Sequence, residues 1–313
     1  MELYPTAENP LPSGARCVGV WTADGVLLRA MHAPVEAAIG TVVFLGGRGD
    51  FMERYFETMR DFMKRGYAVA AFDFRGQGGS ERPQKDRYRN GTADFREFEE
   101  DLRAVMAEAV RLSCPPPYFA IGHSTGGNIL IHAIRRHQWF DKAVAVSPLV
   151  GLLYGNWPLP LVSFLVTLAA AFRLGWMFLP GQNHRPLGRD DFAGNPLSGD
   201  RWRWMRDSGV LEAAPQLGLG GPTFSWLKAA RKSTAALKAM NGQDRLTCPL
   251  LIVEAGLDRV VDNEAMHQFA GRVPGVSLVT IRESLHEILT ERDEIRDQFL
   301  AIFESFVANR DTI

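Results

Sequence analysis

The segment Tyr118–Gly127 contains the residues best suited to chemistry. Its first apolar residues predict a short buried strand, and a Gly-x-Ser-x-Gly turn with a helical pattern behind it follows directly. Gly122 and Gly126 are expected where a Cβ would collide with the neighbouring strand and helix. Ser124 would then lie exposed at the tip of the turn, close to a helix N-terminus that favours an oxyanion. We therefore interpret Ser124 as a catalytic nucleophile, in preference to a residue of a structural turn.

A serine hydroxyl becomes an effective nucleophile only when a base takes its proton, and a carboxylate must hold that base in the right tautomer. Asp258 follows the predicted strand Pro249–Ala255, and His286 follows the predicted strand Val276–Ile281. Both come after Ser124, in the chain order expected when the nucleophile lies on a strand-turn-helix. The sequence therefore predicts Asp258 as the acid and His286 as the base.

Other acids and histidines are interpreted as structural. Glu254 lies within its strand, and Asp262 has the position of an N-cap for a helix that begins near Asn263. His123 lies within the serine turn and is interpreted as a residue that shapes the site. The remaining histidines fall on the early hairpin, on the helix after the serine, in the middle of the chain or on a surface-type helix: His32, His132, His137, His184 and His267.

Two backbone N–H groups are needed to hold an oxyanion. One is expected from Thr125, directly after the nucleophile. The other is expected from the loop Gly46–Phe51, whose glycines allow close approach of the backbone to a substrate. The Arg48 side chain could contact an anion, but a solvated arginine is the simpler interpretation. The loop Asp73–Ser80 is interpreted as a structural loop held by an internal Asp–Arg interaction.

Strands alternate with helices over most of the chain, which predicts an α/β fold with a mostly parallel sheet and helices on both faces. Continuous apolar runs predict buried strands at 41–45, 67–72, 118–121, 142–147, 249–255 and 276–281. Helices are expected at 52–65, 95–112, 128–137, 263–271 and 291–308. An antiparallel hairpin, 17–21 with 26–32, is expected at one edge.

The alternation stops between Leu149 and about Ala236, where Pro, Gly and Trp are frequent and helical patches replace strands. We predict a core of residues 1–148 and 237–313, and an inserted helical cap of residues 149–236 over the strand ends. Residues 159–180 are strongly apolar, but their uncharged part, 161–172, is too short to span a membrane. This part is interpreted as a helix that lies over a pocket or on a bilayer surface.

Composition excludes several classes of function. The 313 residues are 46% hydrophobic, enough for a large core. The 35 basic and 36 acidic residues include no basic block, so nucleic acid is not an expected partner. Cys17, Cys114 and Cys248 are far apart, which indicates free thiols and argues against a metal site. Because the N-terminus lacks the pattern of a signal peptide, a cytoplasmic protein is expected.

Together these motifs resemble the α/β-hydrolase fold, and within it the monoacylglycerol lipase and lysophospholipase group, also called the serine aminopeptidase-like group. Within this group, the chain resembles bacterial lysophospholipase L2-type proteins. The resemblance is carried by Gly46–Tyr55, Asp73–Gly78, Gly122–Gly126, Gly256–Asp258 and His286–Leu289. It implies that Ser124, Asp258 and His286 form the catalytic triad and that Arg48 and Thr125 supply the backbone donors.

One departure from the group concerns the loop after the first core strand. The group usually has His-Gly there, whereas this chain has Gly46-Gly47. Without that histidine the support of the loop is undefined. The second oxyanion donor is therefore either Arg48 or Gly47.

The expected reaction is hydrolysis of a carboxylic ester through an acyl-enzyme, with no cofactor and no metal. The apolar cap suggests an acyl chain as the bound group, since each buried methylene contributes about 0.8 kcal/mol. A monoacylglycerol or lysophospholipid is the expected substrate, and peripheral membrane contact through the cap is expected. The candidate acyl contacts, which could instead form the cap's own core, are Leu161, Phe164, Leu165, Leu168, Phe172 and Trp176.

Two alternatives stay open. The first is a short-chain carboxylesterase or an aminopeptidase of the same fold. A peptidase would need an acid to hold the amino terminus of its substrate, and Asp190, Asp191 and Glu212 are available without a clear cluster. The second is a catalytically silent module that binds a lipid or a partner protein. The oligomeric state is not predicted.

Overall fold

A computed structural model describes residues 1–155, 157–186 and 192–308. Within these ranges eight strands form one sheet in the order β1-β2-β4-β3-β5-β6-β7-β8. The six strands β3 to β8 run parallel to their neighbours among these six and agree with the six predicted strands. They are β3 (Thr41–Leu45), β4 (Ala68–Phe72), β5 (Tyr118–His123), β6 (Lys142–Val146), β7 (Leu250–Ala255) and β8 (Val276–Ile281).

The two ends of the sheet differ from its centre. β1 (Arg16–Trp21) and β2 (Leu27–Ala33) form the predicted antiparallel hairpin, and β2 also pairs antiparallel with β4. β8 ends the sheet on the other side. Its residues are mostly half-buried or exposed, contrary to the predicted burial on both faces, because β8 has a neighbouring strand on one side alone.

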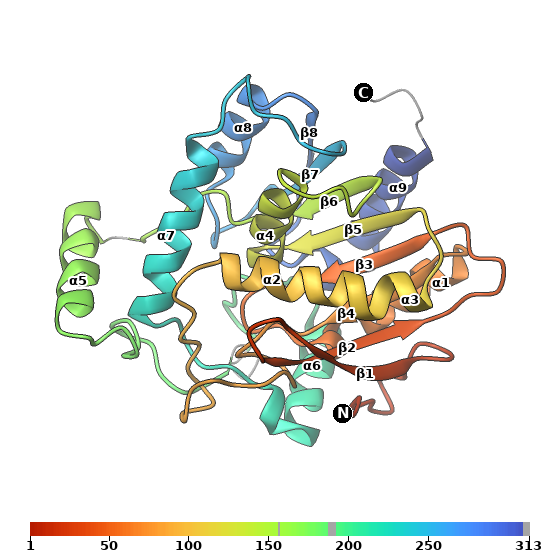
Figure 1. The fold of residues 1–313 in the computed structure, drawn as a ribbon, viewed down its shortest axis with the longest axis horizontal. Coiled ribbons are helices and arrows are strands. Elements are labelled where there is room, and N and C mark those ends of the chain that lie inside the picture. The colour runs from red at the N-terminus through yellow and green to blue at the C-terminus, as the bar shows by residue number, and fades with distance from the viewer. Residues whose placement is uncertain (156, 187–191, 309–313) are drawn as a thin grey trace.

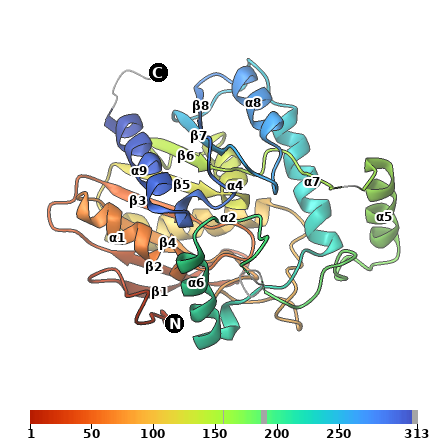
Figure 2. The same cartoon turned by 180° about the vertical axis from the view of Figure 1, so that it is seen from behind.

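Helices cover both faces of the sheet, as Figures 1 and 2 show from opposite sides. One face carries α2 (Arg96–Val105), α4 (Thr125–Ile134) and α8 (Asn263–Arg272), and α2 continues through a π-helical turn (Met106–Val110) into α3 (Arg111–Ser113). The other face carries α1 (Phe56–Lys64), preceded by a 3₁₀ turn at Met52–Tyr55, and α9 (Asp293–Ala308). These helices agree with the predicted ones.

Alternation along the central strands explains why their sequences are continuously apolar. Val43 and Leu45 of β3 belong to the core on the α2 and α4 side, whereas Val42 and Phe44 belong to the core on the α1 and α9 side. Since successive side chains of a strand point to opposite faces, a strand covered on both faces needs apolar residues at every position.

Residues 149–236, here called the inserted segment, connect β6 to β7. Their described part contains α5 (Leu159–Ala171), α6 (Arg201–Ala213), a 3₁₀ turn (Pro215–Leu217) and α7 (Phe224–Lys238). α7 packs against α4 and α8 on one face of the sheet, whereas α5 projects from the molecule and packs against α7 (Figure 1). In the described ranges no helix combines the length and apolarity that crossing a bilayer requires.

Candidate active site

Ser124 occupies a strained turn between β5 and α4. Its φ of 50° and ψ of −113° are rarely adopted by a residue with a side chain. A Cβ on Gly122 would lie 2.7 Å from the Gly126 carbonyl oxygen, and one on Gly126 would lie 2.3 Å from the Leu45 carbonyl oxygen. The Ser124 N–H donates to the Val146 carbonyl at 2.9 Å. Two glycines and the neighbouring strands therefore create the sharp turn.

The loops after β7 and β8 bring Asp258 and His286 together. Nδ1 of His286 lies 2.7 Å from Oδ2 of Asp258. The N–H groups of Val260 and Val261 donate to Oδ1 of the same carboxylate at 2.8 and 3.2 Å. Burial opposes ionisation of Asp258, but the hydrogen bond and charge of His286 together with the two amides hold the pKa of this carboxyl below its ordinary value.

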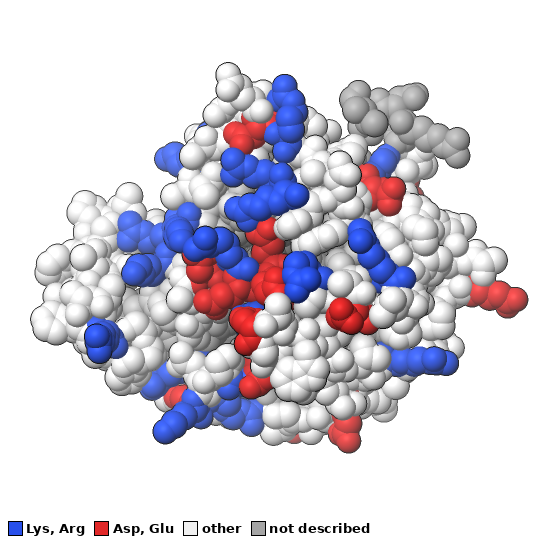
Figure 3. Space-filling model, viewed as in Figure 1, with Lys and Arg blue, Asp and Glu red and all other residues white. Residues whose placement is uncertain are grey.

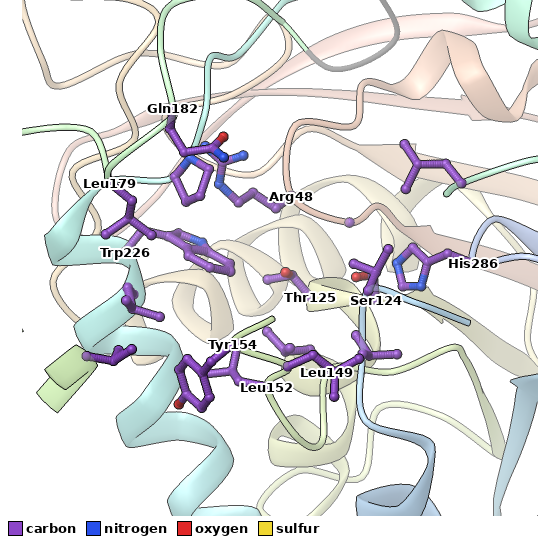
Figure 4. A pocket seen from close by; sticks show the side chains of 18 of the residues that line it. Arg48, Ser124, Thr125, Leu149, Leu152, Tyr154, Leu179, Gln182, Trp226 and His286 are labelled. Atoms are coloured by element: carbon purple, nitrogen blue, oxygen red, sulfur yellow. The ribbon is translucent and has the colours of Figure 1, made fainter. Parts of the chain in front are cut away.

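His286 lies beside the serine turn. The centre of its ring is 4.9 Å from the centre of the His123 ring, and His123 directly precedes Ser124. Ser124 and His286 line the same cavity, and Figure 4 shows their side chains next to each other. Because Asp258 occupies Nδ1 of His286, Nε2 is the ring nitrogen available to accept a proton.

The rival acids have other roles. Asp262 caps the N-terminus of α8, as predicted, by accepting from the Ala265 N–H at 3.2 Å. Glu254 accepts from the Thr280 hydroxyl at 3.2 Å and lies 2.9 Å from Nε2 of His267. These contacts engage both carboxylates elsewhere, which leaves Asp258 as the partner of His286.

The loop of residues 46–51, after β3, lies against the serine turn. A Cβ on Gly47 would be 3.2 Å from Cβ of Ser124. The Gly47 N–H already donates to Oδ2 of Asp50 at 2.6 Å. The Arg48 N–H makes no hydrogen bond within the part of the chain that the structure describes. Thr125 begins α4, where first-turn N–H groups lack helical partners.

Asp50 and His123 support this loop in place of the missing histidine. Oδ2 of Asp50 accepts from Gly47 and from the Tyr55 hydroxyl, and lies 3.2 Å from Nδ1 of His123. Burial opposes the charge of Asp50, but Arg54, His123 and Tyr55 hold the pKa of Asp50 below its ordinary value. Burial lowers the pKa of His123, yet its hydrogen bond to Asp50 raises it above the ordinary value. His123 thus shapes the site, as predicted.

Gln77 holds the same loop from its other side. Its Nε2 donates to the Gly47 carbonyl at 2.9 Å, and its Oε1 accepts from the Gly49 N–H at 3.2 Å. Neither Gln77 nor Asp50 is among the site residues that the sequence predicts. Gln77 belongs to a loop that was interpreted as structural alone, and Asp50 had no partner in the sequence pattern that would have revealed its role.

The loop Asp73–Ser80 has no internal Asp–Arg pair, so this prediction was wrong. Asp73 pairs with Arg29 of β2 at 2.5 Å and accepts from the Met52 N–H at 2.9 Å. Arg75 instead pairs with Asp101 of α2 at 2.7 Å. The two neighbouring charges therefore tie the loop to two separate elements.

A cavity of about 430 Å³ lies over Ser124, between the strand ends and the inserted segment. Much of its wall is apolar and comes from the inserted segment; it includes Leu149, Leu152, Tyr154, Leu179, Trp226 and Leu227. Figure 4 shows Leu149, Leu152 and Tyr154 on one side of the serine, and Arg48 and Gln182 on another. The cavity wall is therefore apolar on one side of the serine, and on the other it combines Arg48 and Gln182 with the apolar Leu179 and Trp226.

Of the six predicted acyl contacts, Leu165 lines the cavity. The other five do not line it and are exposed to solvent: Leu161, Phe164, Leu168, Phe172 and Trp176. α5 turns Val162 and Val166 toward the cavity instead. This part of the prediction was wrong because α5 is apolar on all sides, so its sequence does not indicate which side faces inward.

The Arg48 side chain is half-buried against the inserted segment, contrary to the expected solvated arginine. Its Nη2 donates to the Gly220 carbonyl at 2.6 Å, and its guanidinium lies 5.4 Å from the centre of the Trp226 ring. Arg48 therefore forms part of the cavity wall.

Arg54 connects the inserted segment to the loop that carries His286. Its guanidinium pairs with Asp207 of α6 at 3.0 Å, with Asp50, and with Glu287, the residue after His286. The three buried ion pairs join α6, the loop of residues 46–51 and the loop after β8.

Of the acids considered for a peptidase, the one that the structure describes does not line the cavity. Glu212 is exposed on α6, and Asp190 and Asp191 lie outside the described residues. Among the described residues, no three His, Cys, Asp or Glu side chains are grouped as metal ligands would be.

Comparison with known proteins places these features in context. A family model described as "Serine aminopeptidase, S33" matches residues 36–293. Lysophospholipase L2 of Escherichia coli K12 is 30% identical over 297 residues, covering 90% of this chain and 84% of that protein. Probable lysophospholipase L2 of Haemophilus influenzae is 25% identical over 283 residues, covering 89% of this chain and 87% of that protein.

The fold also matches solved structures. A soluble variant of monoglyceride lipase from Saccharomyces cerevisiae superposes with a TM-score of 0.71, at 19% identity, over 97% of this chain and 98% of that one. The likeness confirms the predicted α/β-hydrolase fold.

Proposed function

We propose that this chain, which belongs to the serine aminopeptidase S33 family of hydrolases, cleaves carboxylic esters of single-chain lipids with Ser124 as nucleophile. The observation that carries the proposal is the position of Ser124 and the His286–Asp258 pair at a cavity with a largely apolar wall. The names of its relatives, lysophospholipase L2 and monoglyceride lipase, agree with a substrate of this class.

The reaction begins when Nε2 of His286 takes the proton of the Ser124 hydroxyl and Oγ attacks the ester carbonyl carbon. Asp258 holds the imidazole in the required tautomer and stabilises the imidazolium that forms. His286 then gives the proton to the oxygen of the leaving alcohol, and the acyl group stays on Ser124. His286 takes a proton from a water molecule as the water attacks the acyl-enzyme, then gives that proton to Oγ of Ser124 as the fatty acid is released.

The oxyanion is held by the N–H groups of Thr125 and Arg48. Arg48 is preferred to Gly47 as the second donor because the Gly47 N–H already donates to Asp50. The Arg48 N–H makes no hydrogen bond to the residues that the structure describes. The bonds from Asp50 and Gln77 fix the loop before substrate arrives, so the donors need little reorganisation during the reaction.

The acyl chain occupies the apolar region of the cavity, against Leu149, Leu152 and Tyr154. Since each buried methylene contributes about 0.8 kcal/mol, a long chain supplies much of the binding free energy. Leu165, Val162 and Val166 of α5 add to the same wall.

Peripheral contact with a bilayer is part of the proposal. α5 exposes Leu161, Phe164 and Leu168, and Phe172 directly after it is 67% exposed. Large apolar side chains gathered on one projecting helix are typical of a binding surface. The three cysteines are free thiols, which suits the cytoplasmic face of a membrane.

Labelling with a fluorophosphonate tests the nucleophile. Wild-type protein is expected to gain the probe's mass at Ser124, and Ser124→Ala is expected to gain none. Ser113→Ala, which removes an exposed hydroxyl at the end of α3, is the matched control and should label as wild type does. Wild-type protein that stays unlabelled would favour a catalytically silent module.

A further inference from the structure

The guanidinium of Arg48 is half-buried and forms no ion pair with a carboxylate of the residues that the structure describes. Its Nη2 donates to the Gly220 carbonyl at 2.6 Å, and its Nε is buried without a hydrogen-bond partner. Burial lowers the pKa of Arg48 to about 9. A desolvated charge in this state is costly until an anion reaches it.

Two fully buried arginines of this chain are paired with carboxylates, unlike Arg48. Arg29 pairs with Glu53 at 2.7 Å, and Arg75 pairs with Asp101 at 2.7 Å. Arg82, which also lacks a carboxylate partner, donates to the carbonyls of four residues: Gly78, Arg87, Gln216 and Leu217. Arg48 has a single carbonyl acceptor and lines the cavity, so its remaining donors are available to a ligand.

The Arg48 side chain lies on the side of the cavity opposite the wall proposed for the acyl chain. The Arg48 backbone lies in the loop beside Ser124, and its side chain extends from there toward Gln182, away from Leu149, Leu152 and Tyr154 (Figure 4). A substrate whose carbonyl is at Ser124 and whose acyl chain follows the apolar wall would direct its alcohol part to the side where Arg48 lies. In a lysophospholipid, a glycerol unit separates the ester from the phosphate, a distance comparable with the reach of an arginine side chain.

We infer that Arg48 binds the phosphate on the alcohol side of the ester, which selects acylglycerol phosphates over neutral monoacylglycerols. The inference rests on the proposed function. Guanidinium is suited to this role because its planar donors match phosphate oxygens in pairs, and the buried setting strengthens the interaction. The Trp226 ring and the Gly220 carbonyl hold the side chain ready for the anion.

The test compares two substrates with the same short acyl chain, both monomeric in solution: 1-acylglycerol 3-phosphate and 1-monoacylglycerol. The quantity is the ratio of their kcat/KM values. Arg48→Met should lower this ratio at least about tenfold, because hydrogen bonds to a charged group are lost, and Arg48→Lys should lower it less. Arg111→Met, which removes an exposed arginine on α3, should keep the wild-type ratio.

A structural role for Arg48 would reduce both activities equally and leave the ratio unchanged, which would overturn the inference. Absence of Ser124-dependent hydrolysis of either substrate by wild type would overturn the proposed function itself. A second measurement needs no variant: glycerol 3-phosphate should slow fluorophosphonate labelling of Ser124, and glycerol at the same concentration should not. Equal effects of the two would contradict phosphate binding.

Discussion

Asp258 determines which nitrogen of His286 faces the chemistry, so its removal tests the proposed triad at the level of one residue. Asp258→Asn keeps the shape of the side chain but can donate to Nδ1 and stabilise the wrong tautomer. We expect kcat to fall on the order of 10⁴-fold, as in serine proteases, with little change in fold. Steady-state kinetics beside circular dichroism measure this.

The matched control for that variant is Asp262→Asn. Asp262 lies four residues further on and caps α8, and asparagine is an equally good N-cap, so activity and stability should both stay near wild type. A loss of activity in Asp262→Asn as large as in Asp258→Asn would contradict the assignment of the acid.

Gln77 is predicted to act on the rate through the position of the oxyanion loop. Gln77→Leu removes the bonds to the Gly47 carbonyl and the Gly49 N–H. Each neutral hydrogen bond contributes about 1 kcal/mol, so the loss of two predicts roughly a thirtyfold fall in kcat with a nearly constant KM. A rise in KM at constant kcat would show that Gln77 serves substrate binding instead.

The site residues that the sequence predicts are those that directly follow a predicted strand. Ser124 follows β5, and Asp258 and His286 follow β7 and β8, so the alternation of elements was enough to bring them together. Asp50 and Gln77 could not be found in this way. Their roles depend on contacts between loops that are close in space and distant in sequence.

At the scale of elements, α4 contains a buried group that makes stability depend on pH. Nε2 of His132 lies 2.9 Å from the Ser233 hydroxyl of α7, and burial lowers the pKa of His132 to about 4. As the pH falls, the unfolded chain binds a proton at this histidine near its ordinary pKa of 6.5, whereas the folded protein does so only near pH 4. The contribution of His132 to the free energy of unfolding is therefore fully present above pH 6.5 and is lost as the pH falls toward 4.

The loss from His132 should be on the order of 3 kcal/mol in the free energy of unfolding. Urea unfolding between pH 7 and pH 4 measures it, with His132→Gln as a reference that does not titrate. The wild-type curve should fall more steeply than that of the variant. Parallel curves would show that His132 is not buried in its neutral form.

Elements were predictable where the period of the sequence is unambiguous. The buried strands β3 and β7 are apolar except at Thr41 and Glu254, and the helices α1 and α9 have apolar residues at helical spacing. α5 is the opposite case, because it is apolar all round and its inward side follows from packing on α7. For the same reason, the acyl contacts on α5 were assigned to the wrong residues.

At the scale of the whole molecule, the proposed membrane contact concerns the projecting end that α5 forms (Figure 1). Figure 3 shows few charged residues over this end of the molecule, in contrast to the charged centre of the same view. Phe164→Gln with Phe172→Gln should weaken binding to phospholipid vesicles more than tenfold, since insertion of each phenylalanine contributes about 1.5–3 kcal/mol. Vesicle flotation measures it.

Leu112→Gln is the control for that experiment. Leu112 is 74% exposed on α3, away from α5, and its replacement should leave flotation unchanged. Equal flotation of wild type and the double variant would contradict a membrane surface on α5.

The central claim is that Ser124 hydrolyses the ester of a single acyl chain held in the apolar cavity. The most direct measurement is kcat/KM for a series of acyl esters from C2 to C16 that share one alcohol, with Ser124→Ala measured in parallel. The account predicts rates that rise with chain length and vanish in the variant. Rates that are highest at C2 to C4, or activity that survives in Ser124→Ala, would contradict it.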